Sequence, residues 1–224
     1  MGPLSGPEEV RTVRIGAVAD THVLEVLPEL PREVLETLEG CGLILHAGDV
    51  TDPVVLEQLE EVAPVIAVEG DHDRAAGLML PRDQVVEVAG HRIGLTHGRR
   101  ARGVEIAAAA LSTARARVTT LGLEHELRRR LGAVDMVVYG HLHVARISRS
   151  RGVSFVNPGG VYTLSSDPAH HQRGLRAWAH ARALSSVPAQ AHHSSVAVIH
   201  VEPGEPIRAE IRSLTQPIRP SATA

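Results

Sequence analysis

The chain has 224 residues, a hydrophobic fraction of 43% and a formal net charge of −3. The length and the apolar content are typical of one globular domain with a core, and the lack of a long basic stripe argues against a nucleic-acid surface. Only 2% of the residues are aromatic. This argues further against single-strand binding, because that function relies on aromatic stacking.

We therefore expect a single domain that spans residues 1–224, with a loose leader at 1–12 and a tail at 216–224. No apolar segment has the length of a membrane span or the context of a signal peptide. The lone Cys41 cannot form an internal disulfide. These features favour a cytoplasmic protein without a membrane partner, and they leave a homo-oligomer open.

Strand and helix patterns alternate in the first third of the chain. Three apolar runs, at residues 13–19, 42–47 and 65–69, have the length and β-branched content of buried strands. Helical spacing lies between them at 32–38 and in a segment that begins at Asp52-Pro53, where Asp is a favoured cap and Pro a favoured first residue. This β-α-β-α-β order predicts parallel strands with right-handed crossovers.

The order of elements changes after this point. A hairpin is expected at 84–96, then two helices within 103–132 that break near 119–122, and then a buried strand at 134–139. Two further hairpins are expected at 144–156 and 194–214. Residues 163–195 lie between them and are polar, with an Ala-rich patch at 175–184 that could form one helix. We interpret this segment as an insertion beside the site.

Polar side chains recur where the expected strands end. Five strand ends carry Asp or His, usually next to Gly: Asp20-Thr21-His22, Gly48-Asp49, Gly70-Asp71-His72-Asp73, His97-Gly98 and Gly140-His141-Leu142-His143. Sheets of α/β proteins collect their functional groups at the carboxyl ends of the strands. Carboxylates and imidazoles together suit Mn²⁺, Fe, Zn²⁺ or Co²⁺ better than Ca²⁺ or Mg²⁺.

The order of these motifs resembles that of the calcineurin-like metallophosphoesterase superfamily. The short chain and Asn157-Pro158-Gly159 look most like its small bacterial and archaeal phosphodiesterase branch, with a match from about Arg14 to Gly160. The resemblance implies an α/β fold, a four-layer αββα sandwich of two mixed β-sheets flanked by helices.

The resemblance also implies two divalent transition-metal ions, with Mn²⁺ favoured and Fe, Zn²⁺, Ni²⁺ or Co²⁺ as alternatives. It assigns seven ligands: Asp20, His22 and His143 to one metal, Asp71, His97 and His141 to the other, and Asp49 as the bridge. A bridging group needs two oxygens, so a carboxylate suits the role of Asp49. His141 and His143 would point the same way in an extended segment, so a turn at Gly140 is needed to separate them.

Two further residues are candidates for catalysis. We interpret His72 as the proton donor to the leaving group and Asp73 as the carboxylate that orients its ring; the alternative is that His72 is structural. His46 is expected to support a ligand by a hydrogen bond. Four other histidines are expected in exposed loops: His170, His171, His192 and His193.

The chain departs from the family pattern at two positions. Asp71 stands where the family usually carries Asn, and it adds a negative charge beside an anionic substrate. Arg99 stands where close relatives often carry His. Its guanidinium either binds a phosphate oxygen or is solvated, and the sequence does not decide between these.

The leading hypothesis is a dinuclear metal-dependent phosphodiesterase that hydrolyses a P–O bond of a small phosphate ester by attack of metal-bound hydroxide. The alternative is a scaffold with the same fold that has lost turnover and acts in protein–protein interaction, like the retromer subunit of the superfamily. A phosphomonoesterase is a third hypothesis, because the same metals serve both reactions. The physiological substrate is not indicated by any residue pattern.

Overall fold

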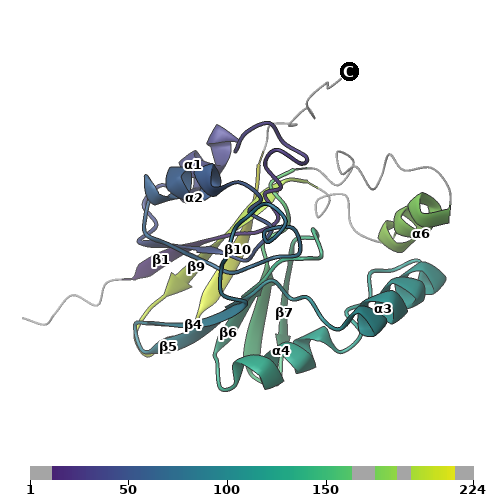
Figure 1. Ribbon diagram of the computed structural model, residues 1–224. Helices are drawn as coiled ribbons and strands as arrows, with labels where there is room; N and C mark the ends of the chain where they lie inside the picture. The colour runs from purple at the N-terminus through teal and green to yellow at the C-terminus, as the bar shows by residue number, and fades with distance from the viewer. Residues whose placement is uncertain (1–11, 163–174, 186–192, 215–224) are drawn as a thin grey trace, which may run out of the picture.

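Two five-stranded β-sheets pack face to face in the computed structural model, which describes residues 12–162, 175–185 and 193–214 (Figure 1). The first sheet has the spatial order β10 (Arg208–Ser213), β9 (Ser195–Val201), β1 (Val13–Val18), β2 (Leu43–His46) and β3 (Val65–Ala67). The second has the order β4 (Asp83–Val88), β5 (His91–Thr96), β6 (Met136–Tyr139), β8 (Val153–Asn157) and β7 (Arg146–Ser150). Both sheets are mixed.

Parallel strands form the centre of each sheet. β1 pairs with β2, and β2 with β3, in parallel, while β9 and β10 extend the sheet as an antiparallel pair. In the second sheet β5, β6 and β8 are parallel, and β4 and β7 are the antiparallel edges. The expected hairpins are confirmed, and so is the β-α-β-α-β order of the first third. The carboxyl ends of β1, β2, β3, β5 and β6 lie on one side of the sandwich.

Within the described ranges, five helices accompany the sheets: α1 (Arg32–Leu38), α2 (Pro53–Glu60), α3 (Arg102–Arg115), α4 (Leu123–Leu131) and α6 (Leu175–Leu184). The start of α2 follows the expected chemistry, because the Asp52 side chain accepts a hydrogen bond from Val54 N at 2.9 Å and Pro53 begins the helix. Pro31 lies directly before α1 with extended backbone.

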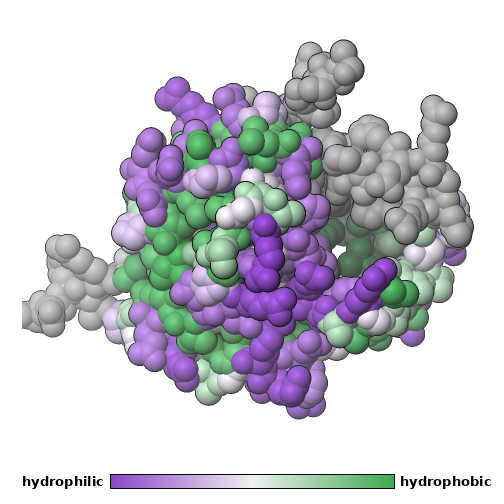
Figure 2. Space-filling view, viewed as in Figure 1, coloured by the Kyte–Doolittle hydropathy of each residue, from purple (hydrophilic) through white to green (hydrophobic). Residues whose placement is uncertain are grey.

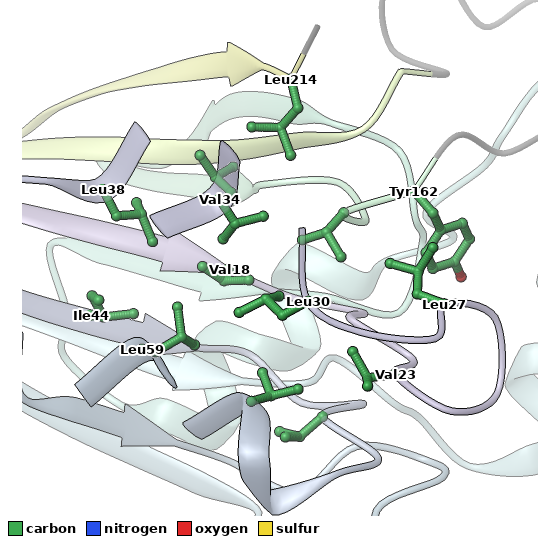
Figure 3. Packing of buried hydrophobic residues seen from close by; sticks show 14 of the residues in the cluster. Val18, Val23, Leu27, Leu30, Val34, Leu38, Ile44, Leu59, Tyr162 and Leu214 are labelled. Atoms are coloured by element: carbon green, nitrogen blue, oxygen red, sulfur yellow. The ribbon is translucent and has the colours of Figure 1, made fainter. Parts of the chain in front are cut away.

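Alternation along β1 divides the core into layers. Ile15 and Ala17 point between the two sheets, where they meet Ile93, Leu95 and other residues of the second sheet. Val18 points to the opposite face, toward α1 and α2. Figure 3 shows this outer layer, in which Val18 and Ile44 lie between Val34 and Leu38 above and Leu59 below. A third cluster packs α4 on the second sheet, with Leu123 and Leu127 against Tyr139 and Phe155. Three apolar clusters thus separate four layers, which confirms the predicted αββα sandwich.

α3 and α6 form a pair at the side of the sandwich, at the right of Figure 1. Thr113 Oγ1 donates to Ala179 O at 3.3 Å, and Arg182 Nε donates to Thr113 O at 3.0 Å. Leu184 of α6 is buried with Val144 and Val118. The expected helix at 175–184 is confirmed, and so is the break between two helices, which spans residues 116–122.

Several expectations concern residues outside the described ranges. These are the leader up to residue 11, the tail at 216–224, and His170, His171 and His192. His193 is described and exposed, as expected. Among the described residues, none of the helices is both long and apolar enough to cross a membrane.

Candidate metal centre

The carboxyl ends of five strands bring the seven predicted ligands to one place. Asp20 and His22 follow β1, Asp49 follows β2, Asp71 follows β3, His97 follows β5, and His141 and His143 follow β6. Asp20, His22, Asp49 and His97 are buried, whereas Asp71, His141 and His143 are partly exposed. The ligands on the open side leave room for a substrate.

The seven side chains fall into two groups. Asp20, His22, Asp49 and His143 form one, and Asp71, His97 and His141 form the other; within each group, one ligand atom per residue lies within 4.8 Å of the others. Asp49 joins the groups, because its Oδ2 lies 3.4 Å from His22 Nε2 and 3.3 Å from His97 Nε2. This division into two groups, with Asp49 between them, is the arrangement that the resemblance leads us to expect.

The backbone at these residues is unusual. Five of the seven have left-handed conformations with φ between 45° and 69°: Asp20, His22, Asp49, His141 and His143. Such conformations cost about 1–3 kcal/mol each and gather at functional sites. Left-handed turns at His141 and His143 bend this segment so that the two imidazoles enter different groups.

Glycine allows the loops to approach closely. A Cβ on Gly70 would lie 2.2 Å from Asp49 N and 2.3 Å from Asp49 Oδ1, distances that no side chain can adopt. Gly48, with φ of +90°, faces Gly70 from the other strand end. A side chain at Gly70 would displace Asp49, and one at Gly48 would displace Gly70 or His97.

The donor atoms fit divalent metal ions. Among the described residues, Asp20 Oδ2, His22 Nε2 and His97 Nε2 are buried and lack a hydrogen bond of good geometry. Buried polar atoms are rarely left in this state. Atoms that face a shared carboxylate without a hydrogen bond suit a set of ligands for a cation, and the oxygen and nitrogen donors suit first-row transition metals.

The sequence matches known proteins in the region that holds these residues. Residues 13–172 match the calcineurin-like phosphoesterase superfamily domain. The chain belongs to this superfamily.

A probable metallophosphoesterase of Methanothermobacter thermautotrophicus is 38% identical over 146 residues, which span 65% of this chain and 75% of the relative. Among solved structures, Vacuolar Protein Sorting 29 from Cryptosporidium parvum has a TM-score of 0.60 at 20% identity, covering 91% of this chain and 99% of that one. A structure described as a novel archaeal phosphodiesterase has a TM-score of 0.51 at 19% identity, covering 89% and 100%. These two structures share the fold. Membership of the superfamily supports a hydrolase of the phosphoesterase class and implies divalent metal ions.

In this calcineurin-like phosphoesterase, further side chains contact three of the predicted histidine ligands. Glu25 Oε2 lies 2.9 Å from His22 Nδ1, Glu105 Oε2 lies 3.5 Å from His141 Nε2, and Tyr162 Oη lies 2.8 Å from His143 Nδ1. Partners of this kind orient metal-binding imidazoles. Sequence analysis misses all three, because they come from a loop, from α3 and from the end of the segment after β8. No spacing relates them to the motifs.

The structure corrects the predicted role of Asp73. Its buried carboxylate accepts hydrogen bonds from the backbone N–H groups of Asp49, Thr51 and Gly70 at 2.7–3.0 Å. It therefore braces the loop that carries Asp49. The carboxylate beside His72 is Glu25 instead, with Oε2 2.9 Å from His72 Nδ1. One carboxylate thus contacts both His22 and His72.

His46 supports the centre through the backbone rather than through a ligand side chain. Its Nδ1 accepts from Gly48 N at 3.2 Å, and its Nε2 lies 3.3 Å from Thr21 Oγ1. Complete burial lowers the pKa of His46 to about 3. A neutral ring is the form that can accept from Gly48. His46 thus contacts Thr21 and Gly48, which are next to predicted ligands in the chain, in place of the predicted hydrogen bond to a ligand.

The two departures from the family pattern lie next to each other. Arg99 Nε is 3.0 Å from Asp71 Oδ1, so the guanidinium offsets the additional negative charge of Asp71. A cavity of about 380 Å³ adjoins this pair, and charged residues that include Arg82, Arg102 and Arg130 line it. Arg99 is therefore neither simply solvated nor free of a protein partner.

Neighbouring charges change the proton affinity of the ligands. Burial opposes the charge on His22, but contact with Asp49 and the negative charge of Asp20 outweigh it and raise its pKa to about 9. Burial also opposes the charge on His141, and contact with Asp71 and Glu105 raises its pKa to about 10. The metal-free centre thus holds protons that a metal ion must displace, since only the neutral ring is a ligand.

We expect the affinity of the metal-free protein for Mn²⁺ to rise with pH up to about 9–10, where His22 and His141 lose their protons. Lowering the pH favours the protonated rings, so each displaced proton weakens binding by about tenfold per pH unit. Competition against a fluorescent chelator at pH 6.5, 7.5 and 8.5 measures this dependence. Affinity that does not change with pH would show that these imidazoles do not bind the metal.

Proposed function

We propose that this chain is a dinuclear metal-dependent phosphodiesterase. The observation that carries the proposal is the position of Asp49, whose Oδ2 lies 3.4 Å from His22 and 3.3 Å from His97, one residue from each group. Asp20, His22 and His143 would hold one ion with Asp49, and Asp71, His97 and His141 would hold the other. When bound, two divalent ions neutralise phosphate charge and make water a good nucleophile near neutral pH.

The residues of the chain would divide the remaining work. Three carboxylates, Asp20, Asp49 and Asp71, oppose the charge of two divalent ions and leave the centre slightly positive, which suits a phosphodiester that carries one negative charge. Arg99 lies on the exposed side of Asp71, where it could also contact a phosphate oxygen. His72 is half exposed and contacts Glu25 through Nδ1. Because Nδ1 contacts Glu25, Nε2 is the atom that would donate to a leaving group.

Metal content and turnover test the proposal together. We expect about two ions per chain after loading with Mn²⁺, and faster hydrolysis of bis(p-nitrophenyl) phosphate than of p-nitrophenyl phosphate. The same assay after chelation should lose turnover. Trace metal after loading would contradict the dinuclear centre, whereas metal with faster turnover of the monoester would contradict only the diester preference.

A second candidate function is a protein-interaction scaffold, which the shared fold of Vacuolar Protein Sorting 29 favours. Here the seven ligands would hold metal for structure alone. Full metal occupancy without hydrolysis of either aryl substrate would support this function over the enzyme. The complete set of Asp and His side chains at the centre favours the enzyme.

His72→Ala is expected to lower turnover of alkyl esters by about 10²–10⁴-fold and of aryl esters much less, because only a poor leaving group needs a proton. Rates for methyl and p-nitrophenyl leaving groups on the same phosphodiester measure the difference. His125→Ala, at an exposed histidine on α4, is the control. Equal losses on both substrates would assign His72 to a structural role.

A further inference from the structure

A second cavity adjoins the metal centre and lies between α3 and α6. It has a volume of about 460 Å³, within the range of small-molecule sites. His141 and Glu105 line one end, so the cavity adjoins the group that contains Asp71 and His97. Figure 2 shows a hollow with apolar residues at its back, between the body of the molecule and the α3–α6 pair.

Most of the rest of the lining is apolar. Small side chains of both helices form the walls: Ala108 and Ala109 of α3, and Ala179 and Ala183 of α6. Val118, Leu142 and Leu184 add larger apolar surfaces. The cavity therefore presents mostly methyl groups away from its end at the metal centre.

The polar residues of the lining already have partners. Ser112 Oγ donates to Ala108 O and accepts from Thr119 N, and Thr113 Oγ1 donates to Ala109 O at 2.9 Å. The Arg100 guanidinium is buried and is held by Glu105 and by backbone carbonyls of the loop after α3. A ligand would find few open hydrogen-bonding groups here except near Glu105 and His141.

One of the two walls comes from the segment that we interpret as an insertion. α3 lies in the long helical segment at 103–132, and α6 lies in the insertion at 163–195. Contacts between them, such as Arg182 Nε to Thr113 O at 3.0 Å, hold the walls in place. One wall of the cavity thus belongs to an elaboration of this chain, where features that select a substrate are expected.

We propose that the cavity between α3 and α6 binds an apolar substituent of the phosphate ester, such as an alkyl chain, while the phosphate lies at the metal centre. The inference rests on the proposed function. The other cavity beside the centre, which Arg82, Arg102 and Arg130 line, has the opposite chemistry. An apolar group gains free energy only in the cavity between the helices.

Alkylphosphonates test the inference without turnover. Calorimetry on the Mn²⁺-loaded protein compares hexylphosphonate with methylphosphonate. We expect hexylphosphonate to bind about 50-fold more tightly, at roughly fourfold for each of about three buried methylenes. Hexyl p-nitrophenyl phosphate and methyl p-nitrophenyl phosphate share a leaving group. We expect kcat/KM for the hexyl ester to exceed that for the methyl ester by about the same factor. Equal binding of the two phosphonates would overturn the inference and leave the proposed function standing.

A pair of alanine variants locates the binding. Ala109→Leu fills the cavity from an exposed position on α3, where Leu is a good helix former, and we expect it to reduce the 50-fold ratio to about threefold or less. Ala107→Leu is the matched control, since Ala107 is exposed and does not line the cavity. A ratio that survives in Ala109→Leu would place the alkyl chain elsewhere and overturn the inference.

A second measurement needs no metal. In protein with ¹³C-labelled alanine methyl groups, hexanol should shift the NMR signals of Ala108, Ala109, Ala179 and Ala183 and leave that of Ala107 unchanged. Absence of these shifts overturns the inference even where the metal proposal holds. If phosphonates fail to bind but the shifts occur, the metal proposal fails and the apolar cavity stands.

Discussion

Asp49→Asn is expected to lower phosphodiester turnover by about 10³-fold and to reduce metal binding in both groups. The change removes one negative charge and one oxygen ligand from the position that His22 and His97 share. Metal ions supply several kcal/mol of charge stabilisation in the transition state, and about 1.4 kcal/mol corresponds to tenfold in rate. The amide oxygen can still accept the hydrogen bond from His72 N that Asp49 Oδ1 accepts at 2.8 Å, so the loop should keep its shape.

Asp52→Asn is the matched control for this variant. Asp52 lies on the same loop, and its side chain caps α2 by accepting from Val54 N. Asn caps a helix about as well as Asp, so metal content and turnover should stay at the wild-type level. Elemental analysis and turnover with Mn²⁺ measure both variants. Asp49→Asn with two ions per chain and normal turnover would contradict a bridging carboxylate at this position.

Gly70→Ala is expected to be the most damaging change that adds a single methyl group. Its Cβ would lie 2.2 Å from Asp49 N, and backbone cannot yield as a flexible side chain does. The loop after β2 must move, and Asp49 moves with it. Misplacing a catalytic group by about 1 Å can cost about 10²-fold in rate, and we expect a loss of at least that size together with a lower melting temperature.

Gly103→Ala provides the comparison, because nothing lies within 4 Å of the Cβ that it adds on α3. Alanine in a helix is favoured over glycine by about 1 kcal/mol, so this variant should melt at the same or a higher temperature with normal turnover. Thermal unfolding and turnover of both variants are the measurements. Normal turnover in Gly70→Ala would mean that the two loops are not in close contact in solution.

The strands of the sandwich, and the meeting of Asp and His side chains at their ends, could be expected from the sequence because they depend on local patterns. A short β-branched run such as Val13–Val18 indicates a strand, and the carboxyl ends of parallel strands meet at one edge. Asp20 and Asp49 could therefore be expected near each other although 29 residues separate them. Glycines next to these residues indicate the close loop contacts that the structure has.

Contacts between distant elements are where sequence reasoning fails. Asp73 follows His72 in the chain, but its carboxylate turns toward the backbone of the loop after β2. The carboxylate that meets His72 belongs to Glu25, 47 residues earlier. Asp71 and Arg99, the two residues that depart from the family pattern, form an ion pair. The sequence does not indicate this pair, since it depends on how the loops after β3 and β5 face each other. The packing of α6 on α3 also depends on shape rather than on a repeating pattern.

Left-handed backbone at five of the seven ligands has a consequence for the order in which the protein matures. Together these residues cost on the order of 5 kcal/mol or more, which is comparable with the net stability of a typical domain. Isolated loops could not bear that cost, so the apolar layers on both sides of the two sheets must form first and impose these conformations. We therefore expect metal to bind to an arrangement that already exists, so that its binding would follow folding rather than trigger it.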